Sequence, residues 1–172
     1  MISKKLAKAL NEQMVFEMYS SYIYLALAAL LEKNKMPGAV HWMRMQADEE
    51  LIHANIFFNY LTDQNAEIEL DAIPKPAVSA KTPLEIFQAA LGHERLVSSR
   101  IGKLAAQAMK ENDFSTMTFL HFFITEQVQE ERSVSNVIDK LEMAGTSREG
   151  LLFVDAELAA RTAPVAPPSA VK

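Results

Sequence analysis

The sequence predicts an all-α protein: a four-helix bundle with a long crossover between helices two and three, followed by a short fifth helix. Three observations support this fold class. Apolar residues recur at helical spacing along most of the chain, and no strand-like alternation persists. The 172 residues include only five glycines and seven prolines, which favours long uninterrupted helices. One segment of about 18 residues, between the second and third helical stretches, has no helical pattern. A chain of this length can form one domain with a substantial core.

Helices one and two are bounded by recognisable signals. Ser3 fits the N-cap of a first helix that extends to about Lys33. The stretch NKMPGAV interrupts the pattern, and Pro37 suits the first turn of a second helix that continues to about Asp63. These two helices form the first predicted hairpin.

Helices three and four are bounded in the same way. The third opens with TPLE, in which Thr82 and Glu85 form a capping box around a proline at the first helical position. It is predicted to end near Asn112. Asp113 can then cap a fourth helix, which Gly145 ends.

The rest of the chain divides into a short helix and a tail. The bundle is assigned to residues 1–145, and 146–161 to a C-terminal unit whose helix covers Arg148–Arg161. That helix is too apolar to face solvent on all sides, so we expect it to dock. Residues 162–172, TAPVAPPSAVK, are rich in proline and alanine and are predicted to be disordered.

The crossover, residues 64–81, contains Pro74 and Pro76. A flexible linker is one interpretation of it. However, about 18 extended residues reach nearly 60 Å, whereas a helix of about 28 residues is only ~42 Å long. The segment can therefore run the full length of the bundle and leave helices two and three parallel.

Composition narrows the function classes. The net charge of -5 disfavours a nucleic-acid partner and is compatible with attracting cations. The absence of cysteine excludes a disulfide framework, a thiolate metal site and a cysteine nucleophile. The N-terminus does not resemble a signal peptide, and the longest nearly apolar run, Tyr22–Leu31, is about half of a membrane span. We therefore expect a cytoplasmic protein with no membrane partner.

The core-facing stripe of each long helix carries a glutamate near its middle: Glu17, Glu50, Glu94 and Glu130. Each lies about 11 to 16 residues into its helix, at depths of roughly 17 to 24 Å. A single such glutamate usually reaches the edge of a bundle, but four at matching depth favour a cluster. Clustered carboxylates need shared protons or cations, and His53 adds an imidazole beside Glu50. The pattern predicts a metal site, with two ions the preferred number.

An enzyme that uses paired carboxylates for acid/base chemistry is the competing interpretation. It fits less well, because four carboxylates and an imidazole are more ligands than that chemistry needs. Phosphate-binding glycine loops, Ser-His-Asp arrangements and basic-aromatic stripes are absent from the sequence.

These residues resemble the ferritins, in particular the non-haem bacterial type. The resemblance rests on Glu17 with Tyr24, on EELIH, and on Glu94 with EQVQEE. It is strengthened by NEQMVFEMYSSYIYL, NYLTDQ and EGLLFVDAEL, and it extends from about Lys5 to Arg161. It implies a hollow shell of 24 subunits that oxidises Fe(II) with O2 or peroxide and stores a ferric mineral. The fifth helix would surround the fourfold axes.

The resemblance also implies ligands. Glu17, Glu50 and His53 would hold one iron, and Glu94 and Glu130 the second, with Glu50 bridging the pair. Two further residues would assist: Gln127 would hold the oxygen species, and Tyr24 would donate an electron. A core tyrosine with a satisfied hydroxyl is the alternative for Tyr24.

A weaker third iron site is implied by Glu49, Glu126 and Gln129. The family pattern has a glutamate where this chain has Gln129, and an amide contributes no charge. Glu131 could substitute, but a solvated surface role is favoured for it.

Departures from other ferritin relatives exclude several cofactors and partners. A haem-binding bacterioferritin would have a second Glu-x-x-His where this chain has Gln127 to Glu130, and a methionine where it has Ile52, so no haem is expected. Rubrerythrin relatives need cysteine pairs, and DNA-coating mini-ferritins lack a long fifth helix.

The sequence leaves two alternatives to a ferroxidase: a divalent metal buffer without turnover, and a purely structural bundle.

The other histidines, His41, His93 and His121, are predicted to be surface or packing residues. Trp42 is predicted to lie in the core or at a subunit contact.

Overall fold

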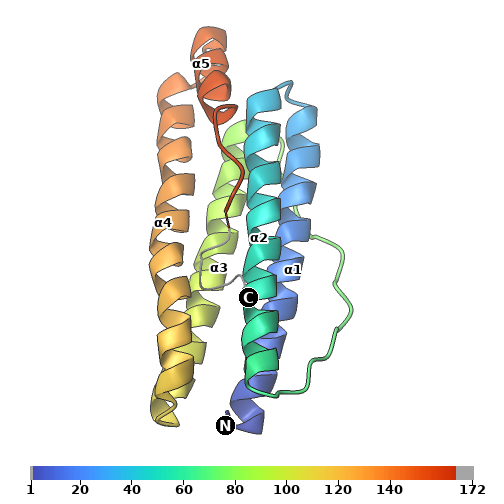
Figure 1. Cartoon of the computed structure of the whole chain (residues 1–172). Helices are drawn as coiled ribbons and strands as arrows, with labels where there is room; N and C mark the ends of the chain where they lie inside the picture. Colours follow the sequence, from blue (N-terminus) through green and yellow to red (C-terminus); the bar gives the residue numbers. More distant parts are fainter. Residues whose placement is uncertain (1, 166–172) are drawn as a thin grey trace.

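The computed structural model describes residues 2–165, and within them it contains five helices and no strand. The helices are α1 (Lys4–Glu32), α2 (Pro37–Asp63), α3 (Pro83–Lys110), α4 (Phe114–Ala144) and α5 (Arg148–Leu158). The first four form the predicted bundle, and α5 packs at one end of it (Figure 1). The fold class is confirmed, although α3 and α5 end earlier than predicted, by two and three residues respectively.

The predicted caps are present. Ser3 accepts a hydrogen bond from the backbone N–H of Leu6, and Thr82 and Glu85 form the reciprocal capping box. Asp113 accepts from the N–H of Thr116, and Gly145 ends α4 with a positive φ of 55°. Local capping residues therefore define the starts of α1, α3 and α4 and the end of α4.

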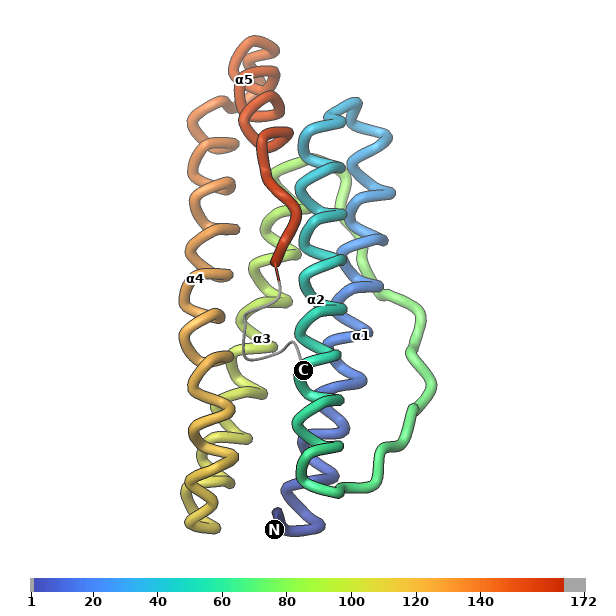
Figure 2. Tube along the Cα trace, viewed as in Figure 1, coloured from blue at the N-terminus to red at the C-terminus, as the bar shows by residue number. Residues whose placement is uncertain are grey.

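The crossover runs along the outside of the α1–α2 hairpin and returns the chain to the end at which α2 began (Figure 2). Helices α2 and α3 are therefore parallel, as predicted. Asn11 fixes this segment to α1: its Nδ2 donates to the carbonyl of Glu69 at 2.9 Å, and its Oδ1 accepts from the N–H of Glu69 at 3.0 Å.

The core consists of two apolar clusters separated by a polar belt. One cluster contains Leu27, Met43 and Phe87, towards the α5 end. The other contains Leu10, Phe57, Phe123 and further residues towards the opposite end. Along every bundle helix the chain passes from one cluster to the other through a glutamate, so the four helices deliver their carboxylates to one level: Glu17, Glu50, Glu94 and Glu130.

Helix α5 docks on the first turn of α2. A Cβ placed on Gly38 would lie only 1.8 Å from the carbonyl oxygen of Asp155, so glycine permits this approach. The Asp155 side chain accepts from the N–H of Ala39 at 2.8 Å, which supplies a hydrogen-bond partner at the helix N-terminus. Val154 and Leu158 are buried beside this contact.

By length and composition, α1 is apolar enough to cross a membrane, and half of its most apolar stretch is buried inside the bundle. The buried residues of α1 include Asn11, Gln13 and Glu17. Such a polar face suits a helix that packs against other helices rather than lipid.

The chain beyond α5 turns back along the bundle, between α4 and α2 (Figure 2). Residues 162–165 have no regular secondary structure. The prediction of disorder for the rest of the tail falls on residues 166–172, outside the described part of the chain.

Candidate metal centre

The four glutamates of the polar belt are all buried. Glu17 and Glu94 have no exposed surface, Glu50 is 2% exposed and Glu130 is 6% exposed. His53 lies in the same belt and is also buried. The structure thus brings together the carboxylates that the helix spacing predicted, and the assignment of each as an iron ligand stays a prediction.

Glu17 is oriented by a short relay from α3. Arg100 Nε donates to Gln13 Oε1 at 2.7 Å, which leaves the Gln13 amide nitrogen to donate to Glu17 Oε1 at 2.9 Å. Arg100 is itself held over the ring of Phe16, with 4.0 Å between its Cζ and the ring centroid. One oxygen of Glu17 is therefore fixed by the protein, and the other stays available.

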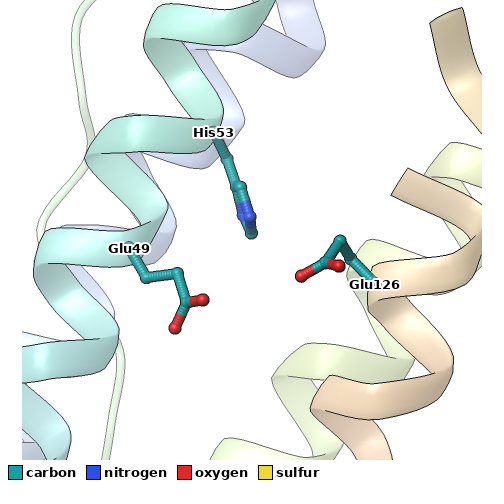
Figure 3. Close-up of side chains that lie close together, drawn as sticks. All are labelled: Glu49, His53 and Glu126. Atoms are coloured by element: carbon teal, nitrogen blue, oxygen red, sulfur yellow. The ribbon is translucent and has the colours of Figure 1, made fainter. Parts of the chain in front are cut away.

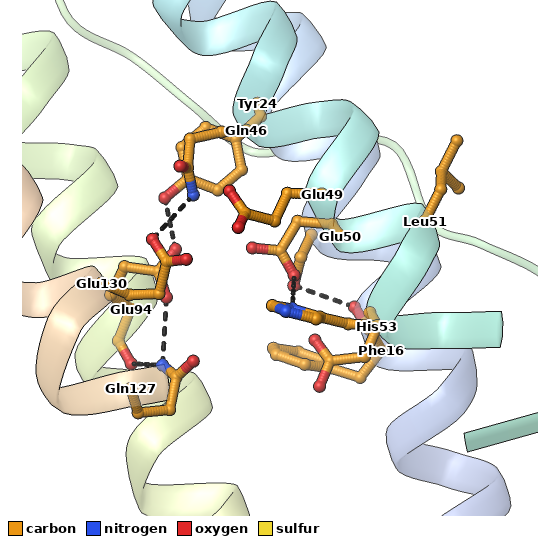
Figure 4. Close-up of polar contacts among 12 residues, drawn as sticks. Phe16, Tyr24, Gln46, Glu49, Glu50, Leu51, His53, Glu94, Gln127 and Glu130 are labelled. Atoms are coloured by element: carbon orange, nitrogen blue, oxygen red, sulfur yellow. Dashed lines mark hydrogen bonds and ion pairs between the residues drawn. The ribbon is translucent and has the colours of Figure 1, made fainter. Parts of the chain in front are cut away.

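Glu50 and His53 face the belt from successive turns of α2. His53 Nδ1 lies 3.5 Å from Glu50 Oε2 (Figure 4). The imidazole packs edge-on against Phe122 and Phe123. These aromatic contacts limit the rotation of the ring, so its nitrogens stay directed towards the carboxylates.

Glu94 and Glu130 receive hydrogen bonds from neighbouring polar side chains (Figure 4). The Tyr24 hydroxyl donates to Glu94 Oε1, and Gln127 Nε2 donates to Glu94 Oε2 at 3.0 Å. Gln46 Nε2 donates to Glu130 Oε2 at 3.0 Å. Tyr24 and Gln127 thus both lie against the carboxylate cluster, where the resemblance to the ferritins placed them.

The cluster strongly resists carrying four negative charges. Burial, followed by repulsion from Glu50, raises the pKa of Glu17 to about 8. Burial and then Glu49 raise the pKa of Glu130 to about 8. Burial raises the pKa of Glu94, and it raises that of Glu50 well above the usual range, with further repulsion from Glu94. Protons or cations must therefore compensate these carboxylates.

Buried polar atoms without hydrogen-bond partners also gather in the belt. Within the part of the chain that the structure describes, four buried side-chain nitrogen or oxygen atoms lack a hydrogen-bond partner: Glu17 Oε2, Gln46 Oε1, Glu50 Oε2 and Arg161 Nη1. Three of them belong to the belt. Buried acceptors without donors are costly, and a cation bound between Glu17 and Glu50 would satisfy two of them.

A second group lies on the side of the bundle that the C-terminal segment covers, and we call it the tail-side group. It consists of Glu49, His53 and Glu126, whose ligand atoms all lie within 4.8 Å of one another (Figure 3). They line a cavity of about 140 Å³. Two of these residues belong to the predicted third site, whereas Gln129 is exposed on α4.

Glu131 faces α3 rather than this group. It accepts a hydrogen bond from Ser98 at 2.5 Å and lies 3.9 Å from Arg95 Nε. This arrangement agrees with the surface role that the sequence favoured for it.

The remaining histidines have packing or surface environments, as predicted. His93 is buried against Phe16 and Tyr24, with its Nε2 2.8 Å from Ser20 Oγ, and burial lowers its pKa to about 4. His41 contacts the carbonyl of Arg161. His121 is exposed.

Sequence reasoning missed four side chains that organise the site: Gln13, Gln46, Arg100 and Arg161. Each glutamine lies four residues before a belt glutamate, a spacing that places both side chains on one helix face. That spacing could have placed both glutamines on the core face, but it could not have shown their partners on other helices, Arg100 and Glu130. The two arginines act through contacts between distant segments, which local spacing does not reveal.

Comparison with known proteins places these features in context. A family model described as a ferritin-like domain matches residues 7–144. The bacterial non-heme ferritin of Escherichia coli O6:H1 is 37% identical over 158 residues, spanning 92% of this chain and 96% of that protein. The bacterial non-heme ferritin of Staphylococcus aureus (strain USA300) is 35% identical over 162 residues, spanning 94% and 98% respectively.

Solved ferritin structures are also similar to this chain in fold. An engineered closed form of the Archaeoglobus fulgidus ferritin superposes with a TM-score of 0.93 at 37% identity, covering 95% of this chain and 100% of that one. The open-pore ferritin of the same hyperthermophilic archaeon gives a TM-score of 0.92 at 38% identity, covering 94% and 100%.

Proposed function

Since the chain belongs to the ferritin family, whose members store iron, we propose that each subunit is also a ferroxidase. It oxidises Fe(II) at a dinuclear site in the polar belt and passes the ferric product into a hollow shell. The observation that carries the proposal is the buried cluster of four glutamates and one histidine, in which one oxygen of Glu17 and one of Glu50 have no hydrogen-bond partner.

In this proposal, one Fe(II) binds to Glu17, Glu50 and His53, and the other to Glu94 and Glu130, with Glu50 shared. Oxygen and imidazole ligands of this kind suit Fe(II). Two Fe(II) ions carry four positive charges, which balance the four carboxylates. The charge balance explains why so many acidic groups can be buried together.

The number of electrons that two Fe(II) ions supply determines which oxidants they can reduce. Each Fe(II) loses one electron, so the pair supplies two, enough to reduce O2 with two protons to hydrogen peroxide. The pair can equally reduce hydrogen peroxide with two protons to two water molecules. Two Fe(III) ions exceed the charge of the four carboxylates by two, which favours their departure with hydroxide or oxide as counter-ions.

Two neighbours have supporting roles. Gln127 already donates to Glu94, and its amide can also steady an oxygen species beside the irons. Tyr24 touches Glu94 through its hydroxyl. When Tyr24 is oxidised, its phenolic proton has Glu94 as an acceptor, so it can supply an electron without creating a buried cation.

For assembly, ferritin neighbours indicate a homo-oligomeric shell, and we propose 24 subunits. Exposed apolar side chains on α5, Leu152 and Phe153, fit contacts with other subunits. Light scattering of the purified protein should give the mass of a 24-mer, and a monomer or dimer would contradict the shell.

The direct test is aerobic addition of Fe(II), followed by near-ultraviolet absorbance. The protein should oxidise two Fe(II) per subunit much faster than buffer does. Glu50→Ala should abolish the fast phase because it removes the shared ligand, while Glu67→Ala, exposed in the crossover, should leave it unchanged.

The alternative is a metal buffer that binds divalent ions without turnover. In that case calorimetry would detect metal binding while Fe(II) oxidation stayed at the rate of buffer. That result would overturn the ferroxidase proposal and leave the dinuclear site intact.

A further inference from the structure

The segment that follows α5 covers the tail-side group, Glu49, His53 and Glu126. Pro164 and Val165 line the same cavity as these three residues. The segment is fixed at its start, because His41 Nε2 lies 2.8 Å from the carbonyl oxygen of Arg161. The C-terminal segment thus contributes side chains to a site built from α2 and α4.

Arg161 brings a positive charge to this site. Its Nη2 donates to Glu49 Oε2 at 2.7 Å, and the side chains of both residues are only 20% exposed. The guanidinium also lies over Trp42, with 4.4 Å between Cζ and the ring centroid. A carboxylate on one side and an aromatic face on the other hold this cation in a defined position.

The guanidinium and a metal ion compete for the same carboxylate. A metal bound to Glu49 Oε2 would lie roughly 2.0–2.2 Å from that oxygen, close to the Arg161 nitrogen that is already 2.7 Å away. Two cations this close repel strongly. A metal ion at Glu49 therefore has to displace the guanidinium from Oε2, or bind the other oxygen against the repulsion of the guanidinium charge.

The charged groups at the two sites also favour metal binding in the belt over the tail-side group. Glu49 and Glu126 supply two negative charges, and Arg161 offsets one of them. Among the described residues, no lysine or arginine forms a salt bridge with the four belt glutamates, and carboxylate oxygens of Glu17 and Glu50 have no hydrogen-bond partner. A divalent ion in the belt thus meets four carboxylates, two of which have unpartnered oxygens, whereas in the tail-side group it meets two carboxylates, one of which is already bonded to Arg161.

We propose that Arg161 is a specificity-determining residue: it occupies Glu49 as an internal cation and so restricts tight metal binding in each subunit to two ions. This inference rests on the proposed function, since the two tight ions are those of the dinuclear site. Arg161 thereby keeps Glu49 and Glu126 free of tightly held iron.

Zn(II) tests the proposal without redox chemistry. Calorimetric titration of the metal-free assembled protein should give two tight equivalents per subunit. Arg161→Gln keeps a polar side chain but loses the charge, and should give three. Arg161→Lys keeps the charge and should stay at two. Arg132→Gln removes the same charge from an exposed position on α4 and should also stay at two.

A double variant assigns the extra ion. Adding Glu49→Gln to Arg161→Gln should return the count to its unmutated value, because the ligand released by the arginine is then gone. An unchanged count in Arg161→Gln, or a third tight ion in the unmutated protein, would overturn the role of Arg161. Failure of the dinuclear site is a separate result: the unmutated protein would bind fewer than two ions, and the gain of one equivalent in Arg161→Gln would still decide the role of Arg161.

Discussion

Replacing Glu17 by glutamine should stabilise the metal-free subunit at alkaline pH while it removes iron oxidation. Glu17 is fully buried, and burial with repulsion from Glu50 raises its pKa to about 8, from an ordinary value of 4.5. The folded state therefore binds this proton more tightly than the unfolded chain. The contribution of Glu17 to stability is therefore fully present below pH 4.5, is lost as the pH rises from 4.5 to about 8, and is absent above that.

The magnitude follows from the same shift. At about 1.4 kcal/mol per pKa unit, the shift corresponds to about 5 kcal/mol of lost stability above pH 8. Removing one charge also relieves its neighbours, which then ionise more readily, so a net gain of about 2 to 4 kcal/mol is expected at pH 9 and below about 1 kcal/mol at pH 5. Glutamine has nearly the same shape, and its carbonyl can still accept the hydrogen bond from Gln13.

Denaturant unfolding of the metal-free protein at pH 5 and pH 9 measures this difference. Glu12→Gln, an exposed change on the same helix, is the control and should have little effect at either pH. An equal effect of Glu17→Gln at both pH values, or a loss of stability at pH 9, would refute the reasoning that the buried charge is costly.

Three further outcomes are expected. Because burial raises the pKa values of the belt glutamates, anaerobic Fe(II) binding at pH 7 should release more than one proton per subunit in a pH-stat; release of none would contradict the raised pKa values. Gly38→Ala should displace α5, because the added Cβ would lie 1.8 Å from the Asp155 carbonyl oxygen; light scattering should then show smaller or heterogeneous assemblies. Gly102→Ala is the control, since its Cβ meets open space, and it should assemble normally. Tyr24→Phe should slow the oxidation of bound Fe(II) in stopped-flow measurements without changing the number of ions bound; an unchanged rate would exclude electron donation.

The bundle and the level of the carboxylates were predictable because their signals are local. Caps such as Ser3, Thr82 and Asp113 define where helices begin, and a constant rise per residue then fixes the depth of each glutamate. The long crossover was predictable from two prolines and from its length alone.

The parts that escaped prediction depend on contacts between distant segments. The Gln13 amide gains its role from Arg100 on another helix, and Gln46 from Glu130. The fifth helix was expected to continue to Arg161, but it ends at Leu158. Beyond it, Arg161 contacts Glu49, Trp42 and the ring of His41, all on α2 and all distant from it in the sequence.

The dinuclear site is tested most directly by a crystal structure of the protein after an anaerobic Fe(II) soak, with anomalous scattering recorded at the iron edge. Two iron peaks should lie among Glu17, Glu50, Glu94 and Glu130, about 3.5 to 4 Å apart as in other two-metal sites, with Glu50 touching both. An empty belt, or iron bound only at Glu49 and Glu126, would contradict the account.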